Sequence, residues 1–463
     1  MLIPLIHSLG DAQLRWFARR IANERGRRLL RFLQDMALRE QIAHAAVHSP
    51  FYRQKFAECG VSPRDIRRAS DLPALGFFTY PSDLAADPYQ FLAVPRQEIV
   101  YAMASSGTTG RPKIVFLSKK DWEFAVRMGS IGMAMAGITA ADVVQILFCS
   151  GNPNWMTGDL IQAELEQIGA FVVPAGNSVP IAQQIEMMQM FGTTVLMGTP
   201  SYVYRLTEEG GKLCDLRSLG IRAINLAAEP WSESLRTFLQ EAWGARIYDS
   251  YGMMELACDG AGECPALCGL HVSPYLLVEV VDPRSGAPLP RGELGELVFT
   301  TLYRQASPLL RYRTGDLARL LPDEMCPCGG VTAERISRIV GRADDMLFLG
   351  SGENVFPAQI EVALMGVEGL SGFQVIIDKV GYRDRLRIRA ETSAPSGHLQ
   401  QAIERRLSEG LPFLQHEIHR SQLIAPLEIE FVESGTLQRE TPVKVRRLVD
   451  RRERGNRAEV ESP

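Results

Sequence analysis

The strongest constraint on the fold is a regular alternation of helical segments and short apolar runs between residues 121 and 255. Helices are expected at 121–135, 160–168 and 181–191. Strands are expected at 143–149, 170–173, 194–197, 223–227 and from residue 246 onward. Strands separated by helices of this length are typical of βαβ units, in which the strands run parallel. We therefore expect a mainly parallel α/β sheet in this part of the chain.

The flanking regions have a different character. Apolar residues recur at helical spacing among arginines in 11–48, which predicts a long helix. Apolar runs separated by Pro- and Gly-containing turns in 277–301 predict antiparallel hairpins, and so a β subdomain beside the parallel sheet. Residues 345–450 predict the order β-α-β-β-α-β, which is a small α+β domain in its own right. The predicted class is α/β, with a large N-terminal domain at 1–343 and a small C-terminal domain at 344–463.

Length and charge exclude several classes of function. The chain has 463 residues and a formal net charge of −4, so its composition does not attract nucleic acid or an anionic membrane surface. No apolar run reaches the roughly 18 residues that a membrane-spanning helix needs. The apolar start lacks the basic region and cleavage site of a signal peptide. We therefore expect a cytoplasmic enzyme with neither nucleic acid nor membrane as a partner.

A loop rich in glycine, serine and threonine joins two strand-like runs, 99–104 and 114–117. Its candidate phosphate-binding residues are Ser105, Ser106, Gly107, Thr108, Thr109, Gly110 and Lys113. Glycines let the backbone turn tightly and bring N–H groups close to an anion, while the hydroxyls and the lysine add donors and positive charge. The loop therefore predicts a polyphosphate cradle, although its spacing differs from that of the Walker loop. A solvent-exposed hairpin turn is the alternative.

Other candidate nucleotide ligands follow predicted strands, where open α/β sheets bind their ligands. One strand ends at Ala228, Glu229 and Pro230, and the next contains Asp249, Tyr251 and Gly252. Tyr251 is suited to stack on a purine, and Asp249 to accept from an exocyclic amine. Glu255 is suited to hold Mg²⁺ beside a phosphate, and Asp316 to accept from both hydroxyls of a ribose. The alternative for residues 246–255 is a strand end with a capped turn, and the alternative for Asp316 is a turn aspartate next to a glycine.

Four separated blocks, taken in order, resemble the adenylate-forming superfamily of acyl-CoA synthetases, luciferases and adenylation domains. The blocks are 105–113, 251–255, 312–316 and 341–345. The stretch HSPFYRQKF beginning at His48, together with 228–231 and 352–361, most resembles phenylacetate–CoA ligases. The resemblance covers essentially the whole chain. It implies that a carboxylate attacks ATP to give an acyl-adenylate and pyrophosphate, and that a thiol, usually of coenzyme A, then displaces AMP.

The resemblance also implies roles for residues that carry no signal of their own. Lys444 would be the catalytic lysine, acting with Glu255, as a point charge that contacts both the carboxylate and the α-phosphate. The chain departs from the family pattern beside it, at Gln438 and Val443. Asp344 would be the hinge of a mobile C-terminal domain, and Arg342 would reach the ribose or a phosphate. Trp155 would wall an aryl ring, with a core tryptophan as the alternative.

Cysteine and histidine cluster in two places, which suggests a metal rather than a disulfide framework. Cys258, Cys264, Cys268 and His271 lie close together, and Cys326 and Cys328 form a Cys-x-Cys pair. Tetrahedral Zn²⁺ takes four Cys or His ligands, usually in closely spaced pairs. Phenylacetate–CoA ligases show a similar pattern. We therefore expect a structural zinc site at Cys264, His271, Cys326 and Cys328, with Cys258 and Cys268 as competitors and separate reduced thiols as the alternative.

These features together predict an AMP-forming acid–thiol ligase that uses ATP with Mg²⁺, coenzyme A and a small aryl carboxylic acid. A rival is the same adenylation with a carrier-protein thiol or an amine as the acceptor. A second rival, of another class, is a non-catalytic scaffold that binds a nucleotide or a metal. The sequence does not identify the acid, and only the resemblance suggests a homodimer.

Overall fold

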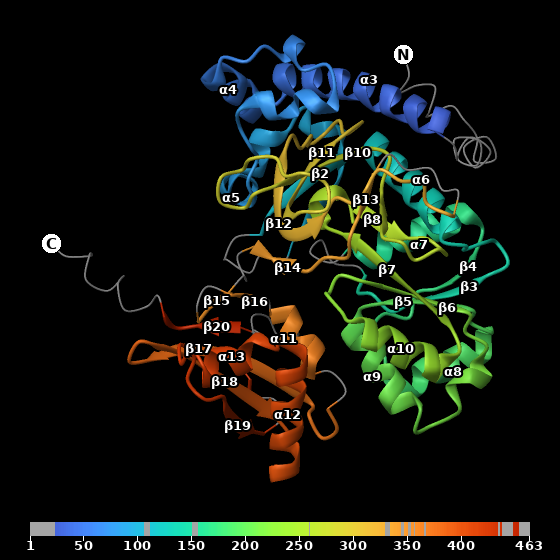
Figure 1. The fold of residues 1–463 in the computed structure, drawn as a ribbon. Helices are drawn as coiled ribbons and strands as arrows, with labels where there is room; N and C mark the ends of the chain where they lie inside the picture. The colour runs from blue at the N-terminus through green and yellow to red at the C-terminus, as the bar shows by residue number, and fades with distance from the viewer. Residues whose placement is uncertain are drawn as a thin grey trace. The chain divides into compact units, whose positions relative to one another are not determined.

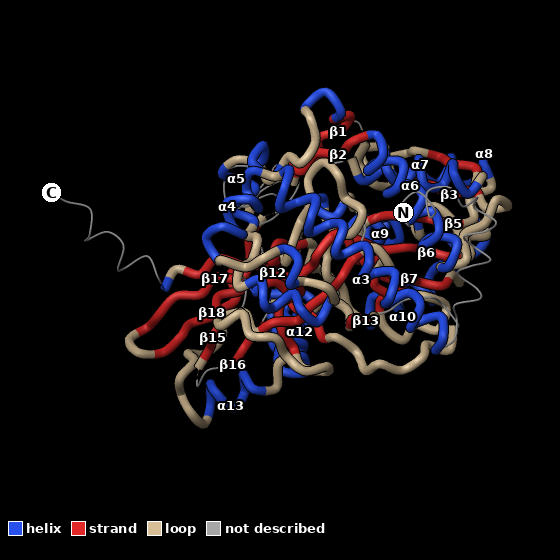
Figure 2. Tube along the Cα trace, turned by 90° about the horizontal axis from the view of Figure 1, so that it is seen from above, coloured by secondary structure: helices blue, strands red, loops and turns tan. Residues whose placement is uncertain are grey.

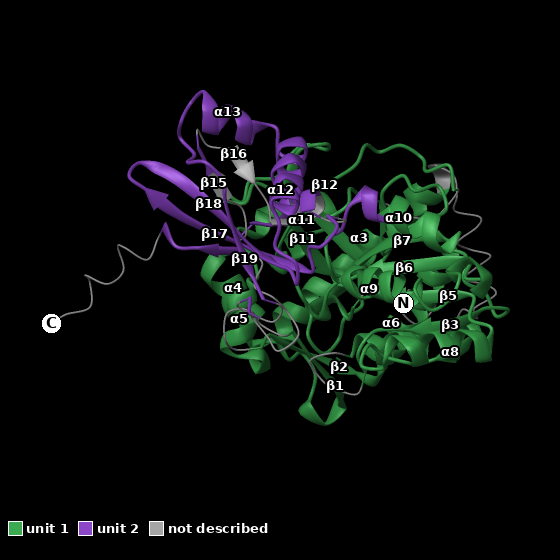
Figure 3. Ribbon diagram, turned by 90° about the horizontal axis from the view of Figure 1, so that it is seen from below, with its two compact units in different colours: residues 1–230, 236–339 green, residues 231–235, 340–463 purple. Residues whose placement is uncertain are grey.

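The computed structural model describes residues 24–105, 112–150, 156–258, 260–328, 334–343, 347–350, 353–355, 357–364, 367–433, 436–437 and 448–452. The chain divides into two compact units, which Figure 3 colours separately. The first unit is Met1–Pro230 with Arg236–Ile339, and the second is Trp231–Leu235 with Val340–Pro463. None of the helices in the described ranges combines the length and the apolar character that crossing a bilayer requires.

An eight-stranded sheet forms the centre of the first unit, in the order β13-β9-β8-β7-β6-β5-β3-β4. Five of its strands are parallel neighbours, which confirms the expected α/β class: β3 (Val143–Ile146), β4 (Phe171–Val173), β5 (Val195–Gly198), β6 (Ala223–Ala227) and β7 (Arg246–Gly252). The sequence did not predict the antiparallel strands that extend it: β8 (Gly260–Glu263), β9 (Leu270–Val272) and β13 (Arg335–Ile336).

Helices cover both faces of this sheet. Figure 1 shows α6 and α7 on one side, and α8, α9 and α10 on the other. Their bounds are α6 (Lys119–Met135), α7 (Thr157–Ile168), α8 (Ile181–Phe191), α9 (Pro200–Gly210) and α10 (Glu233–Trp243). A capping box begins α6: Ser118 Oγ accepts from the Asp121 N–H, and the Asp121 carboxylate accepts from the Ser118 N–H. Asp121 also accepts from the N–H groups of Gln305 and Ala306, so the same carboxylate anchors a distant loop.

The expected β subdomain lies in the same unit. It contains the antiparallel neighbours β10 (Leu276–Val281), β11 (Leu294–Thr301) and β12 (Tyr312–Arg319). A separate hairpin of β1 (Ile99–Ala104) and β2 (Ile114–Ser118) stands at the edge of the unit, as Figure 2 shows. The N-terminal helices are α3 (Glu24–His48), α4 (Pro50–Cys59) and α5 (Pro81–Ala86), and residues 11–23 of the predicted long helix lie outside the described residues.

Short 3₁₀ helices connect these elements, at Pro63–Asp65, Ala69–Leu75, Pro88–Phe91, Arg96–Glu98, Leu216–Leu219 and Met254–Leu256. One hydrophobic cluster joins α3, α4 and the β subdomain. It includes the fully buried side chains of Leu38, Ile42, Tyr52, Phe299 and Tyr312. Burial of such residues is the dominant favourable term in folding, so the strands that end in the candidate site rest on a continuous core.

The second unit has its own core and sheet, of order β19-β18-β17-β20. Its sheet strands are β17 (Gly372–Val380), β18 (Arg383–Glu391), β19 (Glu428–Val432) and β20 (Leu448–Asp450). Its helices are α11 (Pro357–Leu364), α12 (Gly397–Gly410) and α13 (Phe413–His419). Three short strands precede them: β14 (Gly341–Arg342), β15 (Leu347–Leu349) and β16 (Glu353–Val355). In β18 buried and part-exposed residues alternate, as in a strand with one face on a core.

Candidate functional site

The β1–β2 hairpin positions the two ends of the glycine-rich loop. Ala104 pairs with Ile114, and the Ser105 N–H donates to the Lys113 carbonyl over 2.9 Å, which closes the base of the loop. The hydroxyl oxygen of Ser105 is buried and has no hydrogen-bond partner among the described residues. Such a donor is what a phosphate oxygen would satisfy. The other loop candidates, Ser106, Gly107, Thr108, Thr109 and Gly110, lie outside the described residues.

Lys113 and Glu255 form an ion pair at this base. Lys113 Nζ lies 2.7 Å from Glu255 Oε1, and the two side chains are 17% and 3% exposed. Tyr312 Oη donates to the same carboxylate oxygen over 2.9 Å. The structure therefore brings together a predicted phosphate-binding cation and the predicted magnesium-binding carboxylate, which lie 142 positions apart in sequence as residues 113 and 255. A polyphosphate that reached this point would compete with Glu255 for the lysine.

Tyr251 and Asp316 form a second pair. Tyr251 Oη donates to Asp316 Oδ2 over 2.8 Å, and Asp316 is only 8% exposed. Burial, with the charge of Asp316 next, raises the pKa of Tyr251 well above its usual value, so this hydroxyl remains a donor. The ring of Tyr251 stacks on that of Phe299 with an interplanar angle of 25° and centroids 6.2 Å apart. The two residues predicted to contact the base and the ribose of a nucleotide are thus direct neighbours.

Asp249 lies on β7, two residues before Tyr251, and its contacts were not predicted. Arg338 Nε donates to Asp249 Oδ2 over 2.8 Å. Glu263 accepts from the Asp249 N–H over 2.8 Å. Nothing in the local sequence of Arg338 or Glu263 indicates these contacts, since they depend on the antiparallel strands β8, β9 and β13.

Of the remaining residues that the sequence predicts for the site, some lie in the first unit, one lies in the second, and others fall outside the described residues. Ala228 has a left-handed φ of 74°, which turns the chain after β6. The Glu229 carboxylate accepts from the N–H and the hydroxyl of Ser201, over 2.9 and 2.8 Å, so it caps the first turn of α9. Pro230 follows at the end of this stretch, and Gly252 ends β7. Arg342 lies on β14 in the second unit, whereas Trp155, Asp344 and Lys444 lie outside the described residues.

Cys264, His271, Cys326 and Cys328 form a compact cluster. Their ligand-type atoms all lie within 4.8 Å of one another, and three of the four residues are buried. Cys258 is elsewhere, because its Sγ contacts Met254 Sδ at 3.2 Å. Cys268 remains a competitor, with its Sγ 3.0 Å from that of Cys326. Four thiol and imidazole donors in a buried cluster suit tetrahedral Zn²⁺.

The protonation states of the cluster also suit a metal. Burial, with a smaller contribution from Arg335, lowers the pKa of His271 to about 4, so the imidazole is neutral, as a metal ligand must be. Burial raises the pKa of the Cys264 thiol and raises that of Cys326 to about 11. Without a cation these thiols stay protonated, and binding of a metal would release their protons.

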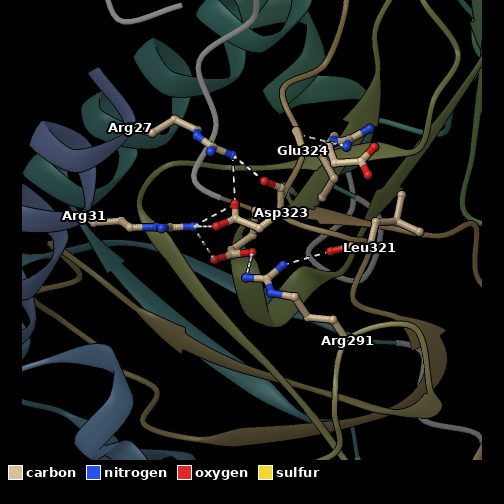
Figure 4. Close-up of polar contacts among 8 residues, drawn as sticks. Arg27, Arg31, Arg291, Leu321, Asp323 and Glu324 are labelled. Atoms are coloured by element: carbon tan, nitrogen blue, oxygen red, sulfur yellow. Dashed lines mark hydrogen bonds and ion pairs between the residues drawn. The ribbon is translucent and has the colours of Figure 1, made fainter. Parts of the chain in front are cut away.

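An ion-pair network holds the loop that precedes Cys326 (Figure 4). Arg27 and Arg31 of α3 donate to the Asp323 carboxylate over 2.7 and 2.9 Å. Arg291 donates to the Leu321 carbonyl over 2.8 Å and to Glu334 over 2.6 Å. Burial alone would raise the pKa of Asp323, but its bonds with the arginines outweigh burial and lower it. The network therefore anchors the cysteine loop to the N-terminal helix.

Comparison with known families identifies two matching regions. Residues 40–302 match the family model described as AMP-binding enzyme. Residues 352–452 match the model described as AMP-binding enzyme C-terminal domain. The first region contains Lys113, Asp249, Tyr251 and Glu255, whereas Asp316, the partner of Tyr251, lies beyond its end.

Individual relatives agree with the family models. A phenylacetate–coenzyme A ligase of Thermus thermophilus is 34% identical over 443 residues, covering 92% of this chain and 97% of the relative. One from Pseudomonas putida is 36% identical over 383 residues, covering 80% and 84%. Among solved structures, a 2-hydroxyisobutyryl-CoA ligase in the postadenylation state, in complex with 2-HIB-AMP, has a TM-score of 0.77 and 26% identity, covering 91% and 89%.

Proposed function

The chain belongs to the AMP-binding enzyme family, in its phenylacetate–coenzyme A ligase branch, and we propose that its substrate is a small aryl carboxylic acid. It is an AMP-forming ligase: it activates a carboxylic acid with ATP and Mg²⁺, releases pyrophosphate, and transfers the acyl group to coenzyme A with release of AMP. The name of both relatives, phenylacetate–coenzyme A ligase, supports the aryl class. The observation that supports the site is the pairing of Lys113 with Glu255 beside that of Tyr251 with Asp316.

The first half-reaction needs positioning and charge compensation. The carboxylate oxygen of the acid attacks the α-phosphorus, and the bond to pyrophosphate breaks, so negative charge moves to the leaving group. In our proposal Lys113 and the hydroxyls of the 105–110 loop hold the polyphosphate. Glu255 would hold Mg²⁺, which neutralises phosphate charge when bound. Asp316 binds the ribose hydroxyls, and the bond from Tyr251 fixes the orientation of its carboxylate.

Residues of both units complete the proposed chemistry. Lys444 supplies the cation that meets both the carboxylate and the α-phosphate, Arg342 reaches the ribose or a phosphate, and Asp344 is the hinge between the adenylating and thioester-forming states. Backbone groups of Ala228, Glu229 and Pro230 line the nucleotide. Trp155 packs against the ring of the acid.

We also propose that the enzyme is a homodimer and that it is located in the cytoplasm. Light scattering after gel filtration would test the first proposal, and cell fractionation would test the second.

A panel of acids tests the substrate class. Phenylacetate, benzoate, anthranilate and aliphatic acids of similar length are compared by pyrophosphate release, with and without coenzyme A. We expect aryl acids to have the highest kcat/KM and to give an aryl-CoA that mass spectrometry identifies. Higher kcat/KM for the aliphatic acids would contradict the proposal. Thioester that forms only on an added carrier protein would favour the rival acceptor.

We further propose that Cys264, His271, Cys326 and Cys328 bind a structural zinc ion, and predict a stability effect of Cys326→Ser. A ligand present at about 100 times its dissociation constant stabilises a fold by about 2.7 kcal/mol, so losing the ion is expected to lower the free energy of unfolding by about 3 kcal/mol. Elemental analysis and chemical denaturation measure both effects. Cys258→Ser is the matched control and should keep its zinc. Protein purified without chelator that contains no zinc would refute the site.

A further inference from the structure

Two residues that are distant in sequence hold Asp249. Arg338 contacts its carboxylate, and Glu263 contacts its backbone N–H. Arg338 Nε donates to Oδ2 over 2.8 Å, and the two side chains are 25% and 11% exposed. The N–H of Asp249 donates to Glu263 over 2.8 Å. Two long-range contacts on one residue therefore fix it in place and orientation.

Glu263 is itself held tightly. It ends β8, and its two carboxylate oxygens accept from Arg236 Nη2 over 2.9 and 3.0 Å. The side chains of this pair are 5% and 3% exposed. Arg236 also donates to the carbonyl of Ile247, on the same strand as Asp249. Arg236 and Glu263 therefore hold the backbone of β7 through hydrogen bonds that do not involve Arg338.

Arg338 approaches Asp249 from the other direction. It follows β13, whose residues Arg335 and Ile336 pair with β9. Strand β9 carries His271, and Glu263 directly precedes Cys264, so the segments that supply the two contacts with Asp249 are connected to the strands of the cysteine–histidine cluster. Arg338 also lies immediately before the boundary of the first unit at Ile339. The partner of the Asp249 carboxylate is therefore supplied by a segment with defined strand pairing, not by a loose surface arginine.

A fixed, ionised carboxylate distinguishes nucleobases. It accepts from the exocyclic amine of adenine, whereas the carbonyl of hypoxanthine would face it with a second acceptor and leave both unpaired. Discrimination requires that the carboxylate keep one orientation, since a carboxylate free to rotate would avoid the mismatch. Removing the arginine that donates to the carboxylate weakens the restraint on its orientation.

We propose that Arg338 is a positioning residue which, by holding the Asp249 carboxylate, sets the preference of the enzyme for ATP over ITP. The inference rests on the proposed function, because it assumes that Asp249 meets the base. Arg338 does not touch the reacting atoms, so its loss should affect nucleotide binding more than turnover. Glu263 and Arg236 hold the backbone and are not expected to set selectivity alone.

The test measures kcat and KM for ATP and for ITP by acid-dependent pyrophosphate release. We expect Arg338→Gln to raise the KM for ATP about tenfold, to leave kcat within about twofold, and to lower the ATP:ITP ratio of kcat/KM about tenfold. Arg338→Lys, which keeps the charge but loses the planar donor, should be intermediate. Arg338→Gln added to Asp249→Ala should have no further effect on the ratio, because both changes remove one interaction.

Arg385→Gln is the matched control. Arg385 pairs with Asp378 over 2.6 Å and is also 25% exposed, but it lies in the sheet of the second unit. Its replacement should leave the ATP:ITP ratio unchanged. If Asp249→Ala abolishes selectivity and Arg338→Gln retains it, the inference is wrong while the proposed function stands. If neither change affects selectivity, the assignment of Asp249 to the base falls as well.

Discussion

Replacing Lys444 by alanine is expected to lower the rate of acyl-adenylate formation by about 10²- to 10³-fold, the usual cost of removing one group that stabilises transition-state charge. The carboxylate and the α-phosphate both carry negative charge and must approach each other, so the barrier rises without a cation between them. Single-turnover pyrophosphate release measures this step. The KM for ATP should change far less than kcat, because polyphosphate binding is assigned to Lys113 and the glycine-rich loop.

Two controls make this result specific. Lys379→Ala removes an exposed cation from β17 of the same unit and should have no effect. The Lys444 variant supplied with a synthetic aryl-adenylate and coenzyme A should still form thioester, because the acid is then already activated. If the Lys444 variant adenylated the acid at the parent rate, another cation would have to stabilise the charge as the carboxylate approaches the α-phosphate.

Replacing Glu255 by glutamine is expected to lower kcat/KM by about 10²-fold or more and to raise the Mg²⁺ concentration needed for half-maximal rate. The glutamine keeps the shape of the side chain, but it removes the charge that pairs with Lys113 and that, in our proposal, binds Mg²⁺. Initial rates across a series of Mg²⁺ concentrations measure both changes.

Glu279→Gln is the control for the stability part of this effect. Glu279 pairs with Arg311 over 2.9 Å in the β subdomain, and those side chains are 14% and 3% exposed, so the loss of a buried charge is comparable. Removing one partner of a buried pair leaves the other uncompensated. Both variants should therefore unfold at lower denaturant concentration, but only the Glu255 variant should change its Mg²⁺ dependence. An unchanged Mg²⁺ dependence in that variant would remove the metal role.

The sequence predicted the parallel sheet because its strands are apolar runs separated by helices. It did not predict β8, whose residues Gly-Ala-Gly-Glu show neither alternation nor β-branched side chains. Because β8, β9 and β13 were not predicted, the contacts that hold Asp249 were not predicted either. The arginine that pairs with Asp249 lies 89 positions away in sequence. Such a contact depends on tertiary pairing that no local pattern reports.

The candidate site was predictable to the extent that residue type limits chemistry. Tyr251 and Asp316 each suit a nucleotide, but their mutual hydrogen bond joins β7 to β12 and follows only from the packing of two sheets. Spacing suggested the four residues of the metal cluster, whereas the exclusion of Cys258 depends on the turn after β7, where Ala257 and Cys258 both have left-handed φ angles. The sequence placed the domain boundary at residue 344, and the compact units of the structure divide between Ile339 and Val340.

The most direct test of the account follows the oxygen atoms of the acid. Phenylacetate with both carboxylate oxygens replaced by a heavy isotope is incubated with ATP, Mg²⁺, coenzyme A and the enzyme, and the AMP is analysed by mass spectrometry. If the carboxylate attacks the α-phosphorus, one labelled oxygen must appear in AMP and none in pyrophosphate. Unlabelled AMP, or ADP with labelled inorganic phosphate, would contradict adenylation as the way in which this protein activates an acid.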